Sequence, residues 1–244
     1  MRKNQKIKCV NCYKEFDITL DTKPFCSKRC SYIDLNNWLG EKYSIHINEE
    51  DYGQTIIGAN PHTAEIIGKE IIKKNIWNPY PKFKVCKKKP AHIDYLGDIY
   101  LKDHNNFIII EMKNVICASY DPNLKKINRR YVFFDKTNPF KRAGIYPNGE
   151  RNQKYKGKSV VSERSVRQID KMINSKQKYQ FAIVFLVNRG DCSTFKPNWQ
   201  RDSVYSKKLV KAAKSGIDVY ALGINWHDTA CDFNGQLEVD LKPW

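Results

Sequence analysis

An apolar stretch in the middle of the chain, FIIIEMKNV, is interrupted by two charged residues of opposite sign. Side chains alternate across an extended strand, so Ile108, Ile110 and Met112 lie on one face. Glu111 and Lys113 then lie together on the other face. Four apolar residues before the glutamate predict a central, buried strand that presents an acid and a base on the same side.

A β-hairpin is predicted around this strand. The shorter run at residues 99–101 precedes it, and the turn-rich pentapeptide KDHNN separates the two. A turn over residues 103–106 pairs the position before the turn with the first apolar residue after it. Continued along the hairpin, this register places Asp98 opposite Glu111. We therefore expect Asp98, Glu111 and Lys113 to meet on one face of one hairpin.

Helical periodicity alternates with apolar strands along the rest of the chain. The predicted elements are a helix over 60–75, a helix over 159–174 with Ser162 as its cap, a strand at 181–187, a helix at about 203–214 and a strand at 217–222. Helix, hairpin, helix, strand, helix, strand predicts an α/β fold, in which helices flank a mixed sheet.

The charge of the chain indicates its class of partner. The 244 residues carry a formal net charge of +17, of which residues 1–50 hold only +2. A protein this basic usually acts on a polyanion, and nucleic acid is the first expectation. No apolar run approaches the ~18 residues that span a bilayer, and no apolar signal region opens the sequence. We expect an intracellular, cytoplasmic protein without a membrane partner.

Four of the eight cysteines crowd the first thirty residues, as two close pairs: Cys9 with Cys12, and Cys26 with Cys30. Each pair can form a metal knuckle, and four thiolates suit a closed, tetrahedral structural Zn²⁺ site. An iron-sulfur cluster is the lesser alternative. A segment this short needs a metal to fold, so residues 1–48 are predicted to form a zinc ribbon.

The knuckle sequences carry a first family resemblance. CVNC, the Cys-Ser-x-Arg-Cys knuckle, Ile33-Asp34-Leu35 and Trp38 together resemble the small YacG proteins, which are known as DNA gyrase inhibitors. The resemblance covers about positions 7–46. It implies a recognition module that docks on DNA, on DNA gyrase or on another DNA-associated protein.

The predicted triad is suited to phosphodiester hydrolysis. Two carboxylates can hold Mg²⁺ or Mn²⁺, and the lysine can steady developing charge at the phosphate. The residues resemble the PD-(D/E)xK nuclease signature, with Gly97 in place of its proline. Asp94 is the rival of Asp98 as first metal ligand, and the sequence leaves the two open. Glu65, on the first helix, lies where this fold class often has another carboxylate.

A second resemblance, to the sugar fermentation stimulation protein A (SfsA) family, covers about positions 56–224. The stretches that carry it are IGAN at 57–60, IDYL at 93–96, IEMKNV at 110–115, VSER at 161–164 and the run from 181 to 220. The resemblance implies a PD-(D/E)xK restriction-endonuclease-like core over residues 49–244. The family usually begins with a small OB-like barrel, and the zinc ribbon stands in its place here.

Residues 116–158 interrupt the family pattern. They contain eleven Lys and Arg, three Asp and Glu and seven aromatic residues. Basic side chains neutralise phosphates and aromatic rings stack on unpaired bases, so the segment is a candidate DNA-gripping arm. A loop whose aromatic rings pack on the core is the equal alternative. The candidate DNA-binding residues are Arg129, Arg130, Lys141, Arg142, Arg164 and Arg167.

Two functions compete at this point. The first is a Mg²⁺-dependent DNA endonuclease that the zinc ribbon directs to its target. The second is a DNA-binding or gyrase-binding regulator in which the nuclease fold is only a platform. A binding module gains nothing from gathering carboxylates where phosphate must approach, which favours the enzyme. RNA remains open as a substrate, and a dimer would suit double-strand cleavage although no residue argues for one.

Overall fold

The computed structural model describes residues 6–9, 14–17, 26–27, 44–49, 53–58, 60–119, 142–227 and 230–243. The chain divides into two compact units, Met1–Ser44 and Ile45–Trp244. Each unit is described by itself.

In the first unit, two short strands form an antiparallel pair. Strand β1 (Lys6–Lys8) pairs with β2 (Glu15–Asp17), and Ile7 lies opposite Phe16. The predicted zinc ligands Cys12 and Cys30 lie outside the described residues.

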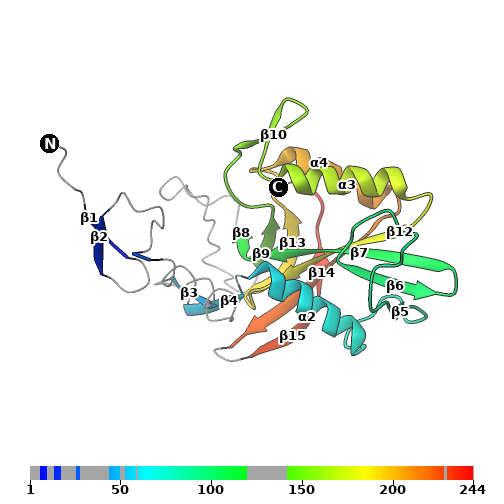
Figure 1. Cartoon of the computed structure of the whole chain (residues 1–244), viewed down its shortest axis with the longest axis horizontal. Coiled ribbons are helices and arrows are strands. Elements are labelled where there is room, and N and C mark those ends of the chain that lie inside the picture. The colour runs from blue at the N-terminus through cyan, green and yellow to red at the C-terminus, as the bar shows by residue number, and fades with distance from the viewer. Residues whose placement is uncertain are drawn as a thin grey trace. The chain divides into compact units, whose positions relative to one another are not determined.

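A nine-stranded mixed sheet forms the centre of the second unit (Figure 1). The strand order is β5-β6-β7-β12-β14-β15-β13-β9-β8. Strands β7, β12 and β14 run parallel, while β6 and β15 run antiparallel to their neighbours β7 and β14. The bounds are β5 (Lys84–Val85), β6 (Ile99–Asp103), β7 (Asn106–Val115), β8 (Cys117–Ser119), β9 (Arg142–Tyr146), β12 (Gln180–Val187), β13 (Cys192–Pro197), β14 (Asp218–Trp226) and β15 (Cys231–Val239).

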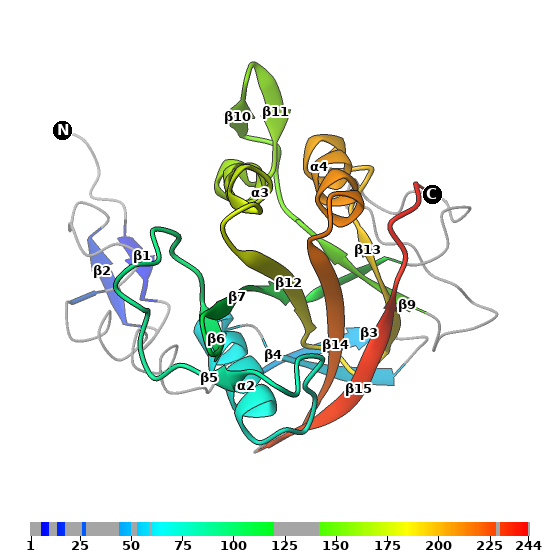
Figure 2. The ribbon, with the colours of Figure 1, turned by 90° about the vertical axis from the view of Figure 1, so that its right-hand side faces the viewer.

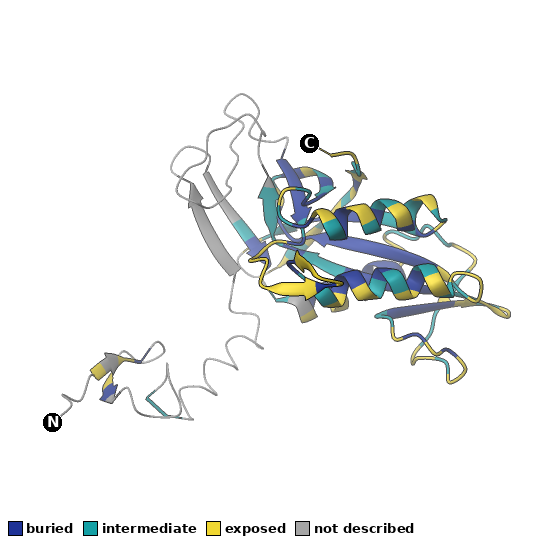
Figure 3. Ribbon diagram, turned by 90° about the horizontal axis from the view of Figure 1, so that it is seen from above, coloured by how far each residue is buried: buried dark blue, intermediate teal, exposed yellow. Residues whose placement is uncertain are grey.

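Helices cover both faces of the sheet (Figure 2). Helices α3 (Glu163–Ser175) and α4 (Ser203–Lys214) lie on one face, and α2 (Pro61–Lys73) lies on the other. Figure 3 shows buried and exposed residues alternating along the helices, while the central strands are mostly buried. This arrangement confirms the predicted α/β class, the large mixed sheet and its flanking helices.

Helix α2 approaches β7 closely because Gly68 has no side chain. A Cβ at this position would lie 2.3 Å from the Cε atom of Met112. Asn60 caps the helix by accepting a hydrogen bond from the backbone N–H of His62 at 2.9 Å. Its buried residues Ala64, Ile71 and Ile72 then pack on the Ile108, Ile110 and Met112 face of β7.

Two further strand pairs lie outside the main sheet. Strand β3 (Ser44–Glu49) pairs with β4 (Gly53–Gly58), and β10 (Gln153–Tyr155) forms an antiparallel hairpin with β11 (Lys158–Val160). The β10–β11 hairpin stands out beyond α3 and α4 in both Figure 1 and Figure 2. Among the described residues, no helix is long and apolar enough to cross a membrane.

Candidate active site

The β6–β7 hairpin has the register expected from the sequence. Lys102 pairs with Phe107, and Asp103 with Asn106. One residue before β6, the backbone N–H of Asp98 donates to the carbonyl oxygen of Ile110 at 3.0 Å, which continues the ladder. Asp98 therefore lies opposite Glu111.

The Asp98 carboxylate is held by a hydrogen bond from β7, the strand that carries Glu111. The backbone N–H of Met112 donates to Asp98 Oδ2 at 2.7 Å. Gly97, the residue before Asp98, allows this close approach. A Cβ at position 97 would lie 2.4 Å from Ile109 Cγ2, so any larger residue would push the Asp98 backbone away from β7.

Glu111, Lys113 and a glutamine from α3 form a closed triangle of hydrogen bonds. Lys113 Nζ donates to Glu111 Oε1 at 2.7 Å and to Gln168 Oε1 at 2.7 Å, while Gln168 Nε2 donates to Glu111 Oε1 at 2.5 Å. Sequence reasoning missed Gln168. Its only signal is its position four residues after Arg164, which puts both on one face of α3.

The carboxyl groups of the site are less acidic than usual. Burial raises the pKa of Asp98, and the Met112 N–H, Lys113 and Arg164 only partly offset this. Burial also raises the pKa of Glu111, which Lys113 lowers and Asp98 raises further. Negative charge is therefore concentrated in a poorly solvated place, and a cation bound there would relieve it.

Charged residues of the same site also shift the pKa of Glu65. Burial and then the charge of Asp98 raise its pKa, and the positive charges of Arg164 and Lys113 lower it. Its carboxylate also lies 4.0 Å from His62 Nδ1 on the exposed side of α2. The structure thus brings Glu65 near the triad from the opposite helix layer.

The residues present fit a divalent cation with few protein ligands. Glu111 is only 3% exposed, and its Oε2 is buried with no hydrogen-bond partner in the described part of the chain. No group of three or more His, Cys, Asp or Glu among those residues is arranged to hold a metal ion. Mg²⁺ is commonly held by one or two carboxylates together with water and phosphate oxygens. Asp98 and Glu111 supply that number.

Asp94, the rival first ligand, lies elsewhere. Its side chain is 64% exposed, and its Oδ2 lies 3.5 Å from Lys178 Nζ. A hydrogen bond from Tyr179 is the main cause that lowers its pKa, and no residue of the triad contributes. The structure brings Asp98 to Glu111 and leaves Asp94 in a surface ion pair.

The six candidate DNA-binding residues separate into three groups. Arg164, exposed at the start of α3, acts electrostatically on Asp98 and Glu111, whereas Arg167 pairs with Glu163 at 2.7 Å. Arg142 corrects the expectation: it is 3% exposed, and its Nη1 lies 2.6 Å from Asp191 Oδ2. It cannot reach a phosphate from that position. Arg129, Arg130 and Lys141 lie outside the described residues.

One cysteine from each predicted zinc knuckle comes to the same small core. Cys9 is buried against Phe16, and Cys26 packs against both. The backbone N–H of Cys9 donates to the carbonyl oxygen of Lys14 at 2.9 Å, which closes the loop that contains Cys12. Cys12 and Cys30 lie outside the described residues, so the four-cysteine zinc site stays a prediction.

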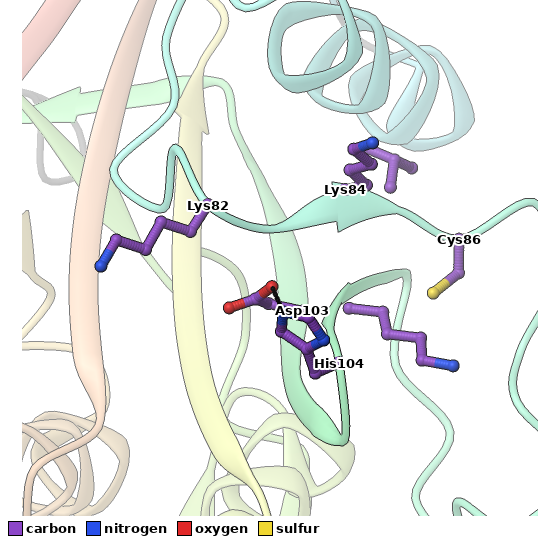
Figure 4. A pocket seen from close by; sticks show the side chains of 7 residues that line it. Lys82, Lys84, Cys86, Asp103 and His104 are labelled. Atoms are coloured by element: carbon purple, nitrogen blue, oxygen red, sulfur yellow. Dashed lines mark ion pairs between the residues drawn. The ribbon is translucent and has the colours of Figure 1, made fainter.

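A hollow of about 490 Å³ lies at the turn end of the β6–β7 hairpin, away from the triad (Figure 4). Lys82 and Lys84 line it from the β5 side, and Asp103 and His104, which lie 3.7 Å apart, line it from the turn. Lys84 is also paired in register with Lys102. The hollow is basic and open, and none of the triad lines it.

Two family models match separate parts of the chain. The model described as "DNA gyrase inhibitor YacG" matches residues 7–55, and the model described as "Sugar fermentation stimulation protein RE domain" matches residues 159–230. The N-terminal and C-terminal parts of the chain are therefore similar to two different families.

Curated relatives divide in the same way. A sugar fermentation stimulation protein homolog of Desulforamulus reducens is 21% identical over 79% of this chain and 65% of its own length. A homolog of Natranaerobius thermophilus is 39% identical over 24% of this chain and 25% of its own length. The DNA gyrase inhibitor YacG of Shewanella sediminis is 41% identical over 21% of this chain and 77% of its own length. The chain thus spans a quarter to about two thirds of these two sugar fermentation stimulation homologs.

A solved structure shares the fold. The structure of Pyrococcus furiosus SfsA in complex with Ca²⁺ superposes with a TM-score of 0.57 at 20% identity, over 78% of this chain and 69% of that one. The likeness extends well beyond the residues that the family model matches.

Proposed function

We propose that this chain, which is similar to the sugar fermentation stimulation proteins and carries a YacG-like N-terminal segment, is a metal-dependent nuclease. The substrate class is DNA, and the reaction is hydrolysis of a phosphodiester bond. The PD-(D/E)xK signature, the Mg²⁺ requirement and the assignment of Asp98, Glu111 and Lys113 to the reaction are all part of this proposal.

The single observation that carries the proposal is the buried Oε2 of Glu111 beside Asp98 and Lys113, which has no hydrogen-bond partner among the described residues. Burying a carboxylate oxygen without a hydrogen bond costs folding free energy, so the arrangement calls for a ligand. A cation fits because two carboxylates converge there. A protein that only bound DNA would be weakened by negative charge at this place, since phosphate must approach it.

Each residue of the site has a definite part in the proposed reaction. Asp98 and Glu111 would hold the cation, which when bound neutralises phosphate charge and makes water more acidic. Lys113, fixed between Glu111 and Gln168, presents an ammonium where charge develops on the phosphate. Arg164, at the exposed start of α3, orients the phosphate from the side.

The solved relative supports the choice of a hard cation, because the Pyrococcus furiosus protein is seen in complex with Ca²⁺. Carboxylate oxygens prefer Ca²⁺ and Mg²⁺ over softer metals. In such sites Ca²⁺ serves as a binding probe, while Mg²⁺ or Mn²⁺ is the expected cofactor for cleavage.

We propose that the YacG-like segment directs the nuclease to its target. Relatives of this segment are named DNA gyrase inhibitors, which makes gyrase or gyrase-bound DNA the first partner to test. Zinc held by Cys9, Cys12, Cys26 and Cys30 would be structural there. The same relatives favour the second candidate function, a gyrase-binding regulator that does not cut.

A matched pair of substitutions tests the nuclease. Asp98→Asn removes the proposed ligand and keeps an oxygen for the Met112 N–H, while Asp94→Asn makes the same chemical change in the surface ion pair. Purified wild type and both variants would be incubated with single-stranded, duplex and branched DNA and with RNA, with Mg²⁺ or Mn²⁺. Loss of a carboxylate ligand weakens the charge stabilisation that the cation would supply, so Asp98→Asn should cut DNA much more slowly than the wild type.

Each possible result of this cleavage test leads to a different conclusion. Cutting by Asp94→Asn at the wild-type rate, with loss in Asp98→Asn, supports the assignment. Equal loss in both variants would contradict the choice of Asp98. If the wild type binds DNA and leaves every substrate intact, the non-catalytic regulator is the better description.

A further inference from the structure

The β10–β11 hairpin is a basic projection of the described chain. The eight residues from Arg151 to Lys158 contain four cations and no carboxylate. Arg151, Lys154, Lys156 and Lys158 are all exposed, and none forms an ion pair with an acid of the described residues. A lysine-rich turn is often merely solvated, so the question is whether the fold holds this one in a fixed place.

The base of the hairpin is anchored at several points. Tyr155 is buried, and its hydroxyl donates to Asp170 of α3. Gln153 Oε1 accepts a hydrogen bond from the backbone N–H of Glu163 at 2.8 Å, and Val160 is fully buried in the core. Because its base is fixed in this way, the hairpin holds its basic tip in a defined direction. A freely solvated loop would not do so.

Further cations gather around the anchor. Lys156 Nζ, the Arg167 guanidinium and Lys208 Nζ lie 5.5, 5.9 and 5.6 Å from the centre of the Tyr155 ring. Asp170, which also binds Lys208, is the acid at their centre. Helix α4, which supplies Lys208, carries three further lysines and no acid. The surface therefore keeps a strong positive excess.

Helix α3 places this surface directly beside the active site. Successive residues of a helix are turned by 100°, so Glu163, Arg167 and Asp170 form one face and Arg164 and Gln168 form the next. The first face contacts the hairpin. The second reaches Glu111 and Lys113 through Gln168. The hairpin and the triad therefore contact neighbouring faces of the same helix.

We propose that the β10–β11 hairpin, with Lys154, Lys156 and Lys158, clamps the phosphate backbone of the nucleic-acid strand that enters the site. This rests on the proposed function and names the surface that holds its substrate. Lysine binds phosphate as a point charge and without regard to sequence. The Tyr155 ring is buried, so it supports the clamp and does not stack on a base. The clamp therefore grips backbone phosphates close to the bond that is cut.

Binding and cutting are measured separately, so that the clamp and the nuclease can fail independently. The probe is a fluorescein-labelled DNA oligonucleotide, single-stranded or duplex, and binding is followed by anisotropy over a salt series without added divalent cation. The test variant carries Lys154→Gln, Lys156→Gln and Lys158→Gln. The matched control, Lys87→Gln with Lys88→Gln and Lys89→Gln, removes the same charge from an exposed loop before β6.

The expected result is a change in salt dependence. Each lost phosphate contact lowers the slope of log affinity against log salt by about 0.7–0.9, so the hairpin variant should lose about two units of slope. At ~0.1 M salt its affinity should fall at least about tenfold. The loop control should keep the wild-type slope. A variant with Arg at the same three hairpin positions should bind like the wild type.

Two outcomes overturn the clamp. One is a hairpin variant with wild-type affinity and slope, and the other is an equal loss in the loop control, which would assign binding to net charge. Melting curves check that each variant folds. If the triple variant does not fold, the single substitutions Lys154→Gln and Lys158→Gln replace it, and each should lower the salt slope by about one unit. A wild type that binds but never cuts would contradict the nuclease and leave the clamp standing.

Discussion

Gln168 offers the sharpest test of how the site is positioned, because it joins α3 to both charged residues of β7. Its amide accepts from Lys113 Nζ at 2.7 Å and donates to Glu111 Oε1 at 2.5 Å. Gln168→Met keeps the length and volume of the side chain and removes both hydrogen bonds. Lys113 then retains only its bond to Glu111 and gains freedom to turn away from the phosphate.

The size of the effect follows from these bonds. Hydrogen bonds to charged groups contribute about 1.5–3 kcal/mol each. Lys113 keeps Glu111 as a partner at 2.7 Å, so we expect the equivalent of one such bond to be lost from the transition state. At about 1.4 kcal/mol for each factor of ten, kcat should fall roughly 10- to 150-fold. KM should change little, because Gln168 does not lie on the phosphate-clamping face of α3.

The assay is steady-state cleavage of a labelled DNA substrate with saturating Mg²⁺. Asn174→Met is the control, since it makes the same change from amide to thioether at an exposed position of α3. The control should cut like the wild type. A Gln168→Met enzyme with an unchanged kcat would refute the positioning role, and a rise in KM alone would show that Gln168 acts on binding.

Three further predictions concern metals and protons. Ca²⁺ at about one hundred times its dissociation constant should stabilise the wild type by about 2.7 kcal/mol and raise its Tm in scanning fluorimetry, and it should leave the Tm of Asp98→Asn unchanged. Because the pKa values of Asp98 and Glu111 are raised, protons compete with the cation, and calorimetry should show Ca²⁺ affinity increasing from mildly acid to neutral pH. Metal analysis should find one zinc per chain, and Cys9→Ser with Cys12→Ser should abolish it; zinc retained in that variant would remove the ribbon assignment.

The strongest patterns in the sequence predict the central part of the fold. The alternation of side chains along residues 107–115 fixes which face of β7 each one occupies. Ile108 lies in the buried cluster with residues of α2, and Ile109 lies in the cluster with residues of α3 and α4. Helices α2 and α4 also lie where periodicity places them. Helix α3 begins after its predicted cap Ser162, whereas residues 159 and 160, which were expected to be helical, belong to β11. Strand β15 was missed although Cys231, Phe233, Leu237 and Val239 alternate with polar residues, because Gly235 interrupts the pattern. Its position next to β14 depends on contacts that no local pattern encodes.

The site is less predictable than the strand that carries it. Register places Asp98 opposite Glu111, but IDYL and DIYL are equally plausible starts of the motif. The loop before β6 decides between them by turning Asp94 toward Lys178 at the surface. Gln168 could not be found because a polar residue on a helix is usually solvated, and its contacts lie 55 and 57 residues away in the chain. Arg142 was misjudged for the same reason: its partner Asp191 lies 49 residues away in the chain.

The raised pKa values also show that the site lowers the stability of the fold when it holds no cation. A carboxyl group with a higher pKa in the folded than in the unfolded state binds its proton more tightly when folded. Its contribution to stability is therefore present below the unfolded pKa and is lost as pH rises through the folded pKa. Asp98, Glu111 and Glu65 share this sign, so around neutral pH all three oppose folding. Lys113 and Arg164 offset part of that cost, and a divalent cation would offset more because it interacts with several carboxylates together. A purely structural ion pair would have no reason to keep a third carboxylate nearby, which is why the electrostatics of this hairpin favour a site built for a ligand.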